Sequence, residues 1–311
     1  MTDLFKALAK QPSWVLLLIV GALIAALPSV SFDKEHYFTT HHPNTLLPVF
    51  IGCTLILIGM VGFGISLWQS EGKDASGVDL TKVSERNGFL STMVNDCEIR
   101  VCEGRIETYQ VDQGIAVALP CNEYFDDHCM HDTRSSLGSY VSRYFSGQVE
   151  ELAGLVRQNA EQQFGEGTIE RRTEREQAMS FGTGHCLLLQ NPLGRPNPIA
   201  FVSTTTQRAR EGLRAEISCL FDGMHELNKA LADARINEVV MPLLGGGHGG
   251  ISAPLALIGL LLAVAEAARY GVGAQRMRRV TIIVFKPDSS TPAVVDRTIA
   301  RKTLALVGTQ N

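Results

Sequence analysis

The sequence predicts a two-helix transmembrane hairpin followed by a three-layer α/β domain with a mostly parallel, mixed central sheet. Three observations predict it. Two long apolar segments near the N-terminus lack charge, short apolar strands alternate with helices after residue 96, and a glycine-rich loop comes late in that alternation. We expect the hairpin over residues 1–70, a linker over 71–95 and the ligand-binding domain over 96–311. The net charge of −4 excludes a broadly cationic nucleic-acid binder.

The predicted spans cover residues 14–30 and 46–68. The second has 23 residues, and at about 1.5 Å per residue it crosses a hydrocarbon layer of about 30 Å. The first has 17 residues and follows Lys6 and Lys10, so a cleaved signal peptide is the alternative. Lys and Arg counts favour an outside loop over 31–45. We therefore expect an inner-membrane protein with two spans, whose termini and large domain are cytoplasmic.

Small residues recur along the first span. Gly21 and Ala25 are one helical turn apart, as are Ala22 and Ala26. Such spacing lets helices approach closely, which favours a homo-oligomer, although glycine and alanine are also simply common in spans. Neither span carries an ionisable side chain, which speaks against a proton relay or a transporter.

The remaining chain alternates between strand and helix patterns. We expect strands at residues 96–101, 114–119, 186–190, 199–205, 238–241 and 280–285. We expect helices at 135–145, 149–163, 213–233 and 254–270. The stretch 253–265 is apolar all round but too short for a bilayer, so it predicts a core helix.

A glycine-rich loop links the strand at 238–241 to the helix after it. Gly245, Gly246, Gly247, Gly249 and Gly250 surround His248, directly after Leu244. Glycine permits positive φ and close ligand approach, and backbone N–H groups beside a helix N-terminus form an anion cradle suited to a diphosphate. His248 either contacts the phosphate or is simply exposed. The loop lacks the lysine of a P-loop.

A second feature is the strand end at Asn122. Ligands of open α/β sheets bind at such edges, and an amide can both donate to and accept from a ribose hydroxyl. In the acidic and aromatic run after it, Tyr124 and Phe125 could stack on a ring. Asp126, Asp127 or Asp132 could accept hydrogen bonds, unless the run is a solvated loop. The hydroxyls of residues 204–207 could also line the pocket.

These residues together resemble a macro domain over Cys97–Pro287, in the strand end at Asn122, the loop at Gly245–Gly250 and the closing strand at residues 279–286. The resemblance implies binding of ADP-ribose or a derivative. With two spans in front, the chain is similar to the membrane-bound effector of type II Thoeris anti-phage defence. That likeness implies a partner TIR-domain enzyme that consumes NAD, a histidine-ADP-ribose signal, no other cofactor, and membrane disruption.

The chain departs from the macro-domain pattern in two places. Gly104-Arg105-Ile106 stands where many macro domains have Gly-Asp-Ile, whose aspartate helps hold adenine, and Glu103 is a substitute candidate. The second glycine run of hydrolytic members is replaced by residues 123–132. We therefore expect a non-enzymatic sensor. The alternatives are a membrane-tethered ADP-ribosyl hydrolase that uses Asn122 and an aspartate, and a non-catalytic tether for ADP-ribosylated proteins.

Other polar residues are weaker candidates. Cys121, His128, Cys129 and His131 lie close in sequence, but their spacing does not suit structural zinc, and we expect no metal. We expect Cys97 and Cys102 to be buried thiols. His185 is a weak catalytic candidate. The charge run at residues 170–176 is expected to be solvated.

Overall fold

The computed structural model describes residues 79–208, 212–247, 249–270, 277–288 and 290–308. The described chain belongs to one compact unit that begins at Asp79. The predicted spans at 14–30 and 46–68, and the loop between them, lie outside the described residues. Within the described part, no helix combines the length and the apolarity that a bilayer crossing requires.

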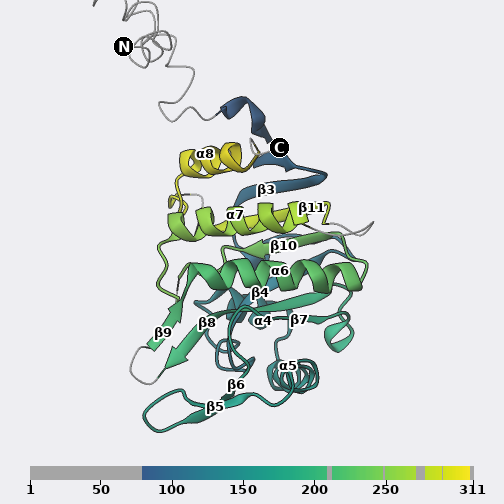
Figure 1. Ribbon diagram of the computed structural model, residues 1–311, viewed down its shortest axis with the longest axis vertical. Helices are drawn as coiled ribbons and strands as arrows, with labels where there is room; N and C mark the ends of the chain where they lie inside the picture. The colour runs from purple at the N-terminus through teal and green to yellow at the C-terminus, as the bar shows by residue number, and fades with distance from the viewer. Residues whose placement is uncertain (1–78, 209–211, 248, 271–276, 289, 309–311) are drawn as a thin grey trace, which may run out of the picture. The chain divides into compact units, whose positions relative to one another are not determined.

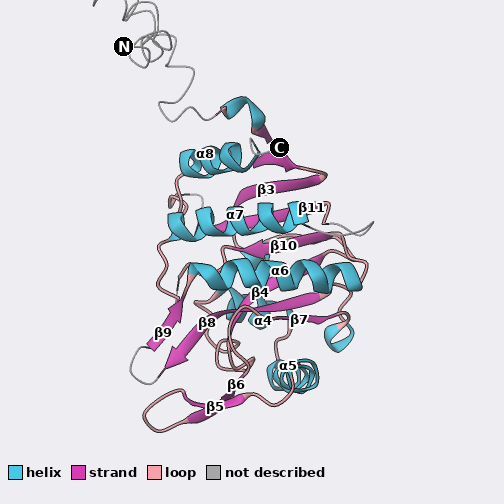
Figure 2. Cartoon of the chain, in the orientation of Figure 1, coloured by secondary structure: helices cyan, strands magenta, loops and turns pink. Residues whose placement is uncertain are grey.

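A nine-stranded mixed sheet forms the centre of the domain (Figure 2). The strand order is β1-β2-β3-β11-β10-β4-β8-β7, and β9 pairs with β8. The bounds are β1 Ser84–Arg86, β2 Phe89–Val94, β3 Cys97–Gly104, β4 Ala116–Asn122, β7 Cys186–Leu189, β8 Ile199–Arg208, β9 Gly212–Ala215, β10 Glu238–Pro242 and β11 Arg279–Phe285. Strands β3, β11, β10, β4 and β8 run parallel, and the outer pairs are antiparallel. The predicted mixed, mostly parallel sheet is confirmed.

Helices cover both faces of this sheet, which gives the three predicted layers (Figure 1). On one face lie α6 Ile217–Asp233, α7 Ala253–Tyr270 and α8 Arg297–Gly308; on the other lie α4 Ser136–Tyr144 and α5 Val149–Phe164. Short 3-10 turns occur at η2 Leu80–Lys82, η3 Ile106–Thr108 and η4 Pro192–Gly194. A separate two-stranded hairpin, β5 Thr168–Arg171 and β6 Gln177–Ser180, follows α5.

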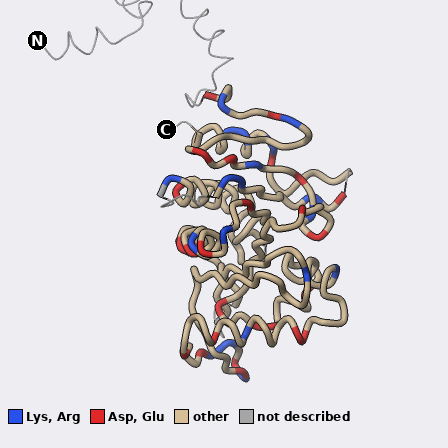
Figure 3. The backbone as a smooth tube through the Cα atoms, turned by 90° about the vertical axis from the view of Figure 1, so that its right-hand side faces the viewer, with Lys and Arg blue, Asp and Glu red and all other residues tan. Residues whose placement is uncertain are grey.

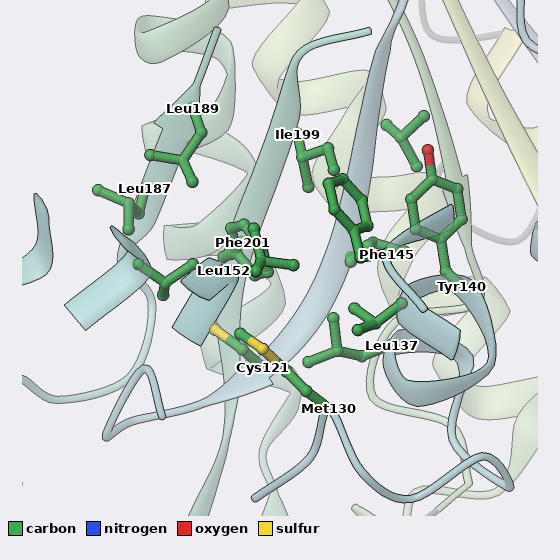
Figure 4. Packing of buried hydrophobic residues seen from close by; sticks show 14 of the residues in the cluster. Cys121, Met130, Leu137, Tyr140, Phe145, Leu152, Leu187, Leu189, Ile199 and Phe201 are labelled. Atoms are coloured by element: carbon green, nitrogen blue, oxygen red, sulfur yellow. The ribbon is translucent and has the colours of Figure 1, made fainter. Parts of the chain in front are cut away.

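Strand β4 is buried on both faces because helices pack on each side of it. Its residues Val117 and Leu119 join the core beneath α4 and α5. Figure 4 shows Phe145, Leu152 and Phe201 of the same core. Alternate side chains of a strand point to opposite faces, so a strand that lies between two helical layers is apolar throughout. This burial explains the short continuous apolar run that predicts β4.

Helix α7 is the core helix that the sequence predicts. Its residues Ala256, Leu257, Leu260 and Val264 are fully buried. The helix packs against the sheet and has α6 and α8 as neighbours on either side. A helix enclosed in this way needs apolar side chains around most of its circumference, which explains its composition.

The structure corrects several element boundaries. Residues 84–94, assigned to the linker, form β1 and β2, which extend the sheet beyond β3. Their turn contains Asn87 and Gly88, both with positive φ, and the Asn-Gly dipeptide is the hairpin signal that was missed. The helix predicted from residue 213 begins at Ile217, because residues 212–215 pair with β8 as β9. The hairpin β5–β6 and helix α8 were not predicted.

Acidic and basic residues are interspersed over the described chain (Figure 3). On α8, Arg297 and Arg301 both bond Glu85 of β1. On the sheet, Arg279 pairs with Glu98 at 3.2 Å and with Glu238 at 2.8 Å. Burial alone would raise the pKa of Glu98, but its hydrogen bonds with Arg100 and Arg279 outweigh burial, so the pKa is lowered. The mixture of signs agrees with the small net charge.

Candidate ligand-binding edge

Three parallel strands end at the same edge of the sheet and bring the predicted site elements together. Strand β4 lies between β10 and β8. Asn122 is the last residue of β4, and the glycine-rich loop follows Pro242 at the end of β10. The end of β8 pairs with β9 from Thr205 onward. Carboxyl ends of parallel strands are where open α/β sheets bind ligands.

The glycine-rich loop depends on its glycines for two different reasons. Gly247 has a φ of +98° with open space around it. Glycine is favoured there because of this positive φ, and not because a Cβ would lack space. A Cβ on Gly249 would lie 2.6 Å from Cβ of Ala215 and 3.1 Å from Cγ2 of Thr205. The N–H of Ala215 also donates to the Gly249 carbonyl at 2.8 Å. The loop therefore lies against the β8–β9 hairpin.

The loop leads directly into helix α7, which begins at Ala253. Leu244, a predicted ligand-binding residue, is fully buried in this conformation. The N–H of Gly250 donates to the Gly247 carbonyl at 3.1 Å, which closes a turn before the helix. The first N–H groups of a helix and its dipole attract anions, as the sequence predicts for this loop. His248 lies outside the described residues.

The Asn122 side chain organises the turn after β4. Its Oδ1 accepts from the N–H of Tyr124 at 3.0 Å. Its Nδ2 donates to Oδ1 of Asp126 at 3.1 Å and to Sγ of Cys129 at 3.6 Å. The residue is 1% exposed. In this conformation Asn122 therefore shapes the edge, and a ribose hydroxyl would have to share its amide.

Tyr124 and Phe125, predicted to stack on a ligand ring, are both buried in this conformation. Phe125 is fully buried and packs against Phe164 and Phe181, with ring centroids 5.3 Å and 6.1 Å away. It keeps a φ of +49°. Tyr124 is also buried, and its hydroxyl donates to the Gln207 carbonyl at 2.6 Å. Both rings are therefore part of the core. The amino-acid sequence alone does not distinguish buried aromatic rings from exposed ones.

Asp126 connects the turn to a buried arginine that the sequence analysis missed. One carboxylate oxygen accepts from Asn122, and the other pairs with Nη1 of Arg172. Nε of Arg172 donates to Oε1 of Gln207 at 3.1 Å, and the guanidinium carbon lies 5.1 Å from the centre of the Tyr124 ring. The side chain of Arg172 is 3% exposed, which corrects the expectation that the whole charge run at 170–176 is solvated.

Glu123 is a second buried charged residue at this edge. Its carboxylate accepts from Oγ of Ser180 at 2.9 Å and from the N–H of Gln207 at 3.1 Å. Its backbone bonds Thr205 and Phe181. Glu123 thus joins β6 to the end of β8, and the predicted pocket-lining run at 204–207 takes part in this network through Gln207.

The remaining acidic candidates lie toward α4 and α5. Oδ1 of Asp132 accepts from Nε of Arg134 at 2.9 Å. Nε2 of His131 lies 3.5 Å from Asp127 and 3.4 Å from Glu150, and the three groups could hold a cation. Both His131 and Glu150 are exposed, and Glu150 lies in the first turn of α5, where the helix dipole disfavours a cation. We assign this cluster to polar contacts at the surface.

The thiols near the edge are not in the ionised form that metals prefer. Burial, followed by the nearby Asp126 carboxylate, raises the pKa of Cys129 to about 11. Burial also raises the pKa of Cys121 well above its usual value. Both stay protonated at neutral pH, whereas a thiolate is the usual ligand of zinc.

The positions expected near adenine are engaged with other side chains. Oε2 of Glu103, the suggested substitute for the missing aspartate, lies 2.7 Å from Nζ of Lys286. Arg105 pairs with Glu107 at 2.9 Å and lies over the Phe285 ring at 5.6 Å. An adenine here would therefore meet an arginine and an aromatic ring rather than an aspartate.

His185, directly before β7, is a packing residue. Its ring centre is 4.9 Å from that of Phe164. Its N–H and carbonyl both bond Ser203 on β8. These contacts place His185 at the start of β7 and give it a structural role in this conformation.

Comparisons with known proteins show the family of this chain. A family model described as Thoeris protein ThsA, Macro domain, matches residues 110–284, more than half of the chain. No curated protein matches the chain. The solved Oceanobacillus iheyensis macrodomain with ADP has 11% sequence identity and a TM-score of 0.48, over 70% of this chain and 96% of that chain.

The macrodomain of Thermus aquaticus DarG has 17% identity and a TM-score of 0.39, over 61% of this chain and 98% of that chain. The macrodomain of Mycobacterium tuberculosis DarG has 16% identity and a TM-score of 0.39, over 60% and 98%. The family model carries the assignment, since it covers both the Asn122 strand end and the glycine-rich loop. The chain belongs to the Thoeris ThsA macro-domain family.

Proposed function

We propose that this domain is the sensor of an anti-phage defence effector, and that its signal is an ADP-ribose derivative, histidine-ADP-ribose, made by a partner TIR-domain enzyme. On binding, a homo-oligomer rearranges and its N-terminal hairpin disrupts the inner membrane. The observation that carries the ligand class is the glycine-rich loop, which leads into α7 and lies against the end of β8.

The loop supplies the chemistry that a diphosphate needs. Gly247 keeps a positive φ in open space, so a phosphate oxygen can approach the backbone without meeting a Cβ. The N-terminus of α7 adds a partial positive charge to the same place. Asn122 and Asp126 lie at the end of the adjacent strand β4, where the distal ribose of the ligand would follow the diphosphate.

The same edge supports binding better than hydrolysis. An ADP-ribosyl hydrolase would use Asn122 and an aspartate to position water. Here the Asn122 amide bonds Asp126 and Cys129, and the Asp126 carboxylate pairs with Arg172. A general base must reach its proton through a hydrogen bond of its own. Because these groups bond one another, we rank the hydrolase second and the non-catalytic tether third among the candidate functions.

Coupling to the membrane has a thermodynamic requirement. A ligand shifts a resting equilibrium only by its difference in affinity for the two states. Moving the population from 1:99 to 99:1 takes about 5.5 kcal/mol of that difference. A ligand that spans the glycine-rich loop and the Asn122 turn makes contacts on two separate strand ends, so a change in their spacing alters its affinity.

Titration calorimetry of the full chain in detergent tests the proposal, with ADP-ribose and histidine-ADP-ribose as ligands. We expect Gly247→Glu to abolish binding, because a carboxylate would stand beside the diphosphate. Gly88→Glu is the matched control: Gly88 also has a positive φ and open space, but it lies in the β1–β2 turn. Equal losses in both variants, or no binding to the wild type, would refute the loop as the site.

Two further measurements separate the candidate functions. Leakage of dye from liposomes that carry the full chain should follow addition of the signal for an effector, and should be absent for a simple tether. Chromatography of the ligand after incubation should recover it intact for a sensor. Recovery of cleaved ligand, lost in Asn122→Ala, would move the hydrolase to first place.

A further inference from the structure

The charge run at residues 170–176 contains one residue that behaves unlike the others. Arg171, Glu174 and Arg175 are exposed. Arg172 is 3% exposed and lies directly after β5, where the hairpin turns toward the Asn122 turn. Arginine is seldom fully buried unless its charge is paired. We therefore consider the hydrogen-bond partner of each guanidinium nitrogen.

Two of the three nitrogens are accounted for. Nε donates to Gln207 at 3.1 Å, and Nη1 pairs with Asp126. The face of the guanidinium lies over Tyr124 at 5.1 Å. The third nitrogen, Nη2, is buried and has no hydrogen-bond partner among the described residues. An unpaired buried donor is unfavourable, and it is most so on a charged group.

A carboxylate of the chain already stands beside this guanidinium without bonding it well. Oε1 of Glu176 lies 3.6 Å from Nη1, beyond hydrogen-bond distance, and its side chain is 51% exposed. Glu176 can therefore swing into solvent without breaking a hydrogen bond to Arg172. The hairpin that carries both residues pairs only with itself among the described strands, as a sheet separate from the central one.

The position of Arg172 relative to the edge indicates which part of a ligand it would meet. The glycine-rich loop follows β10, on one side of β4, and Gln207 lies on β8, on the other side. Asp126 bonds both Asn122 and Arg172. A ligand whose diphosphate lies at the loop and whose distal ribose lies at Asn122 would direct its far end toward Arg172.

We infer that Arg172 is the binding residue for an oxyanion at the distal end of the ligand, where a carboxylate or phosphate accepts a hydrogen bond from Nη2. This inference rests on the proposed function and adds a specificity determinant to it. A guanidinium held on its other sides is preorganised for an anion, and charge-assisted hydrogen bonds of this kind are strong. Arg172 would then distinguish ADP-ribose from derivatives that carry an anionic group on the distal ribose.

The test uses four ligands and the full chain in detergent. The ligands are ADP-ribose, ADP-ribose 1″-phosphate, histidine-ADP-ribose and its carboxamide analogue, in which the carboxylate is replaced by a neutral amide. We expect the wild type to bind the carboxylate about tenfold or more tightly than the carboxamide. A phosphate preferred over the carboxylate would assign the same site to a phosphate ligand.

Three variants isolate the arginine. Arg172→Gln should bring the ratio of carboxylate to carboxamide affinity close to one. Arg175→Gln, which removes an exposed charge from the same run, should leave that ratio unchanged. Glu176→Gln removes a negative charge 3.6 Å from Nη1 that would repel an anion bound to the same guanidinium. It should tighten binding of the ligands with an anionic distal group severalfold while leaving the affinity for ADP-ribose unchanged. A merely structural role for Arg172 would not produce that opposite sign.

The outcomes separate the inference from the proposed function. Binding of ADP-ribose by the wild type, with no preference for either anionic ligand over its neutral counterpart, overturns the role of Arg172 and leaves the sensor function standing. Absence of binding of all four ligands overturns both. If Arg172→Gln fails to fold, as seen by circular dichroism, the response of Glu176→Gln decides: unchanged anion affinity overturns the inference.

Discussion

Gly138 in helix α4 is a position where a single methyl group should be costly. A Cβ on this residue would lie 2.2 Å from the carbonyl oxygen and 2.5 Å from the carbonyl carbon of Asp132, and 3.0 Å from the carbonyl oxygen of Cys129. All three are backbone atoms, so a side-chain rotation cannot relieve the contact. The segment from Cys129 to Asp132, which follows the Asn122 turn, must move if Gly138 becomes alanine.

The size of the effect follows from two opposing contributions. Alanine is favoured over glycine inside a helix by about 1 kcal/mol. Overpacking costs about 1–3 kcal/mol, and moving the segment also disturbs the N-cap, where Oγ of Ser135 accepts from the N–H of Gly138 at 2.9 Å and donates to the Asp132 carbonyl at 2.8 Å. Losing a cap costs about 1 kcal/mol. We expect Gly138→Ala to lower the free energy of unfolding by about 2 kcal/mol.

Gly154 in α5 supplies the matched control. It is also a helical glycine, and a Cβ there meets nothing within 4 Å. Gly154→Ala should raise the free energy of unfolding by about 0.5–1 kcal/mol. For a domain of this size 1 kcal/mol shifts the Tm by about 2–4 °C. Thermal unfolding followed by circular dichroism should therefore show opposite shifts, and a Gly138→Ala variant as stable as Gly154→Ala would refute the reasoning.

Three further predictions concern the edge and the thiols of β3. Gly249→Ala should weaken binding of ADP-ribose at least tenfold in calorimetry, since the new methyl would meet Ala215 at 2.6 Å and displace the loop; unchanged affinity would show that the loop position is irrelevant. Tyr124→Phe removes a buried hydroxyl that donates to the Gln207 carbonyl, and urea unfolding should show a loss of about 1–2 kcal/mol, whereas no loss would mean that the bond contributes nothing. Burial raises the pKa of Cys97 to about 12 and of Cys102 to about 11. The thiols of the unfolded chain ionise near pH 8.5. Below that pH the buried, protonated thiols add their full contribution to the free energy of unfolding. Above it, ionisation stabilises the unfolded chain, so the urea midpoint should fall between pH 9 and 11. Replacing both by alanine should flatten that fall, and an equally steep fall would exclude them as its cause.

Much of the fold could be predicted because its signals are local. The strands β4, β8, β10 and β11 begin with or consist of short apolar runs. The helices between them are flanked by polar or glycine-containing segments. Parallel order then places Asn122 and the glycine-rich loop at one edge, and the structure brings them there. The elements that were missed are β1, β2, β5, β6, β9 and α8. In β1, β5, β6 and β9 at most one side chain is buried, so they carry little hydrophobic periodicity. In β2 every second residue is buried and α8 has a buried apolar face, so a periodic signal was present in both.

The polar details of the site could not be predicted in the same way. Tyr124 and Phe125 stand in an acidic run that reads as exposed, yet both rings are buried. Arg172 stands in a dense charge run, yet it is the one arginine there that contacts Asp126. Whether a ring or a charge is buried depends on chain segments far away in sequence, and here those segments are α5 and the hairpin β5–β6.

The α/β architecture, the glycine-rich loop and the family can be recognised in the sequence, because periodicity, strand length and motif order are properties of neighbouring residues. The hydrogen bonds among the polar groups at the edge depend instead on the packing of distant segments. The Asn122 amide donates a hydrogen bond to Asp126. Asp126 in turn accepts from Arg172, which lies 46 residues later in the sequence. Such bonds arise when folding removes water from polar groups and each must find a partner in space.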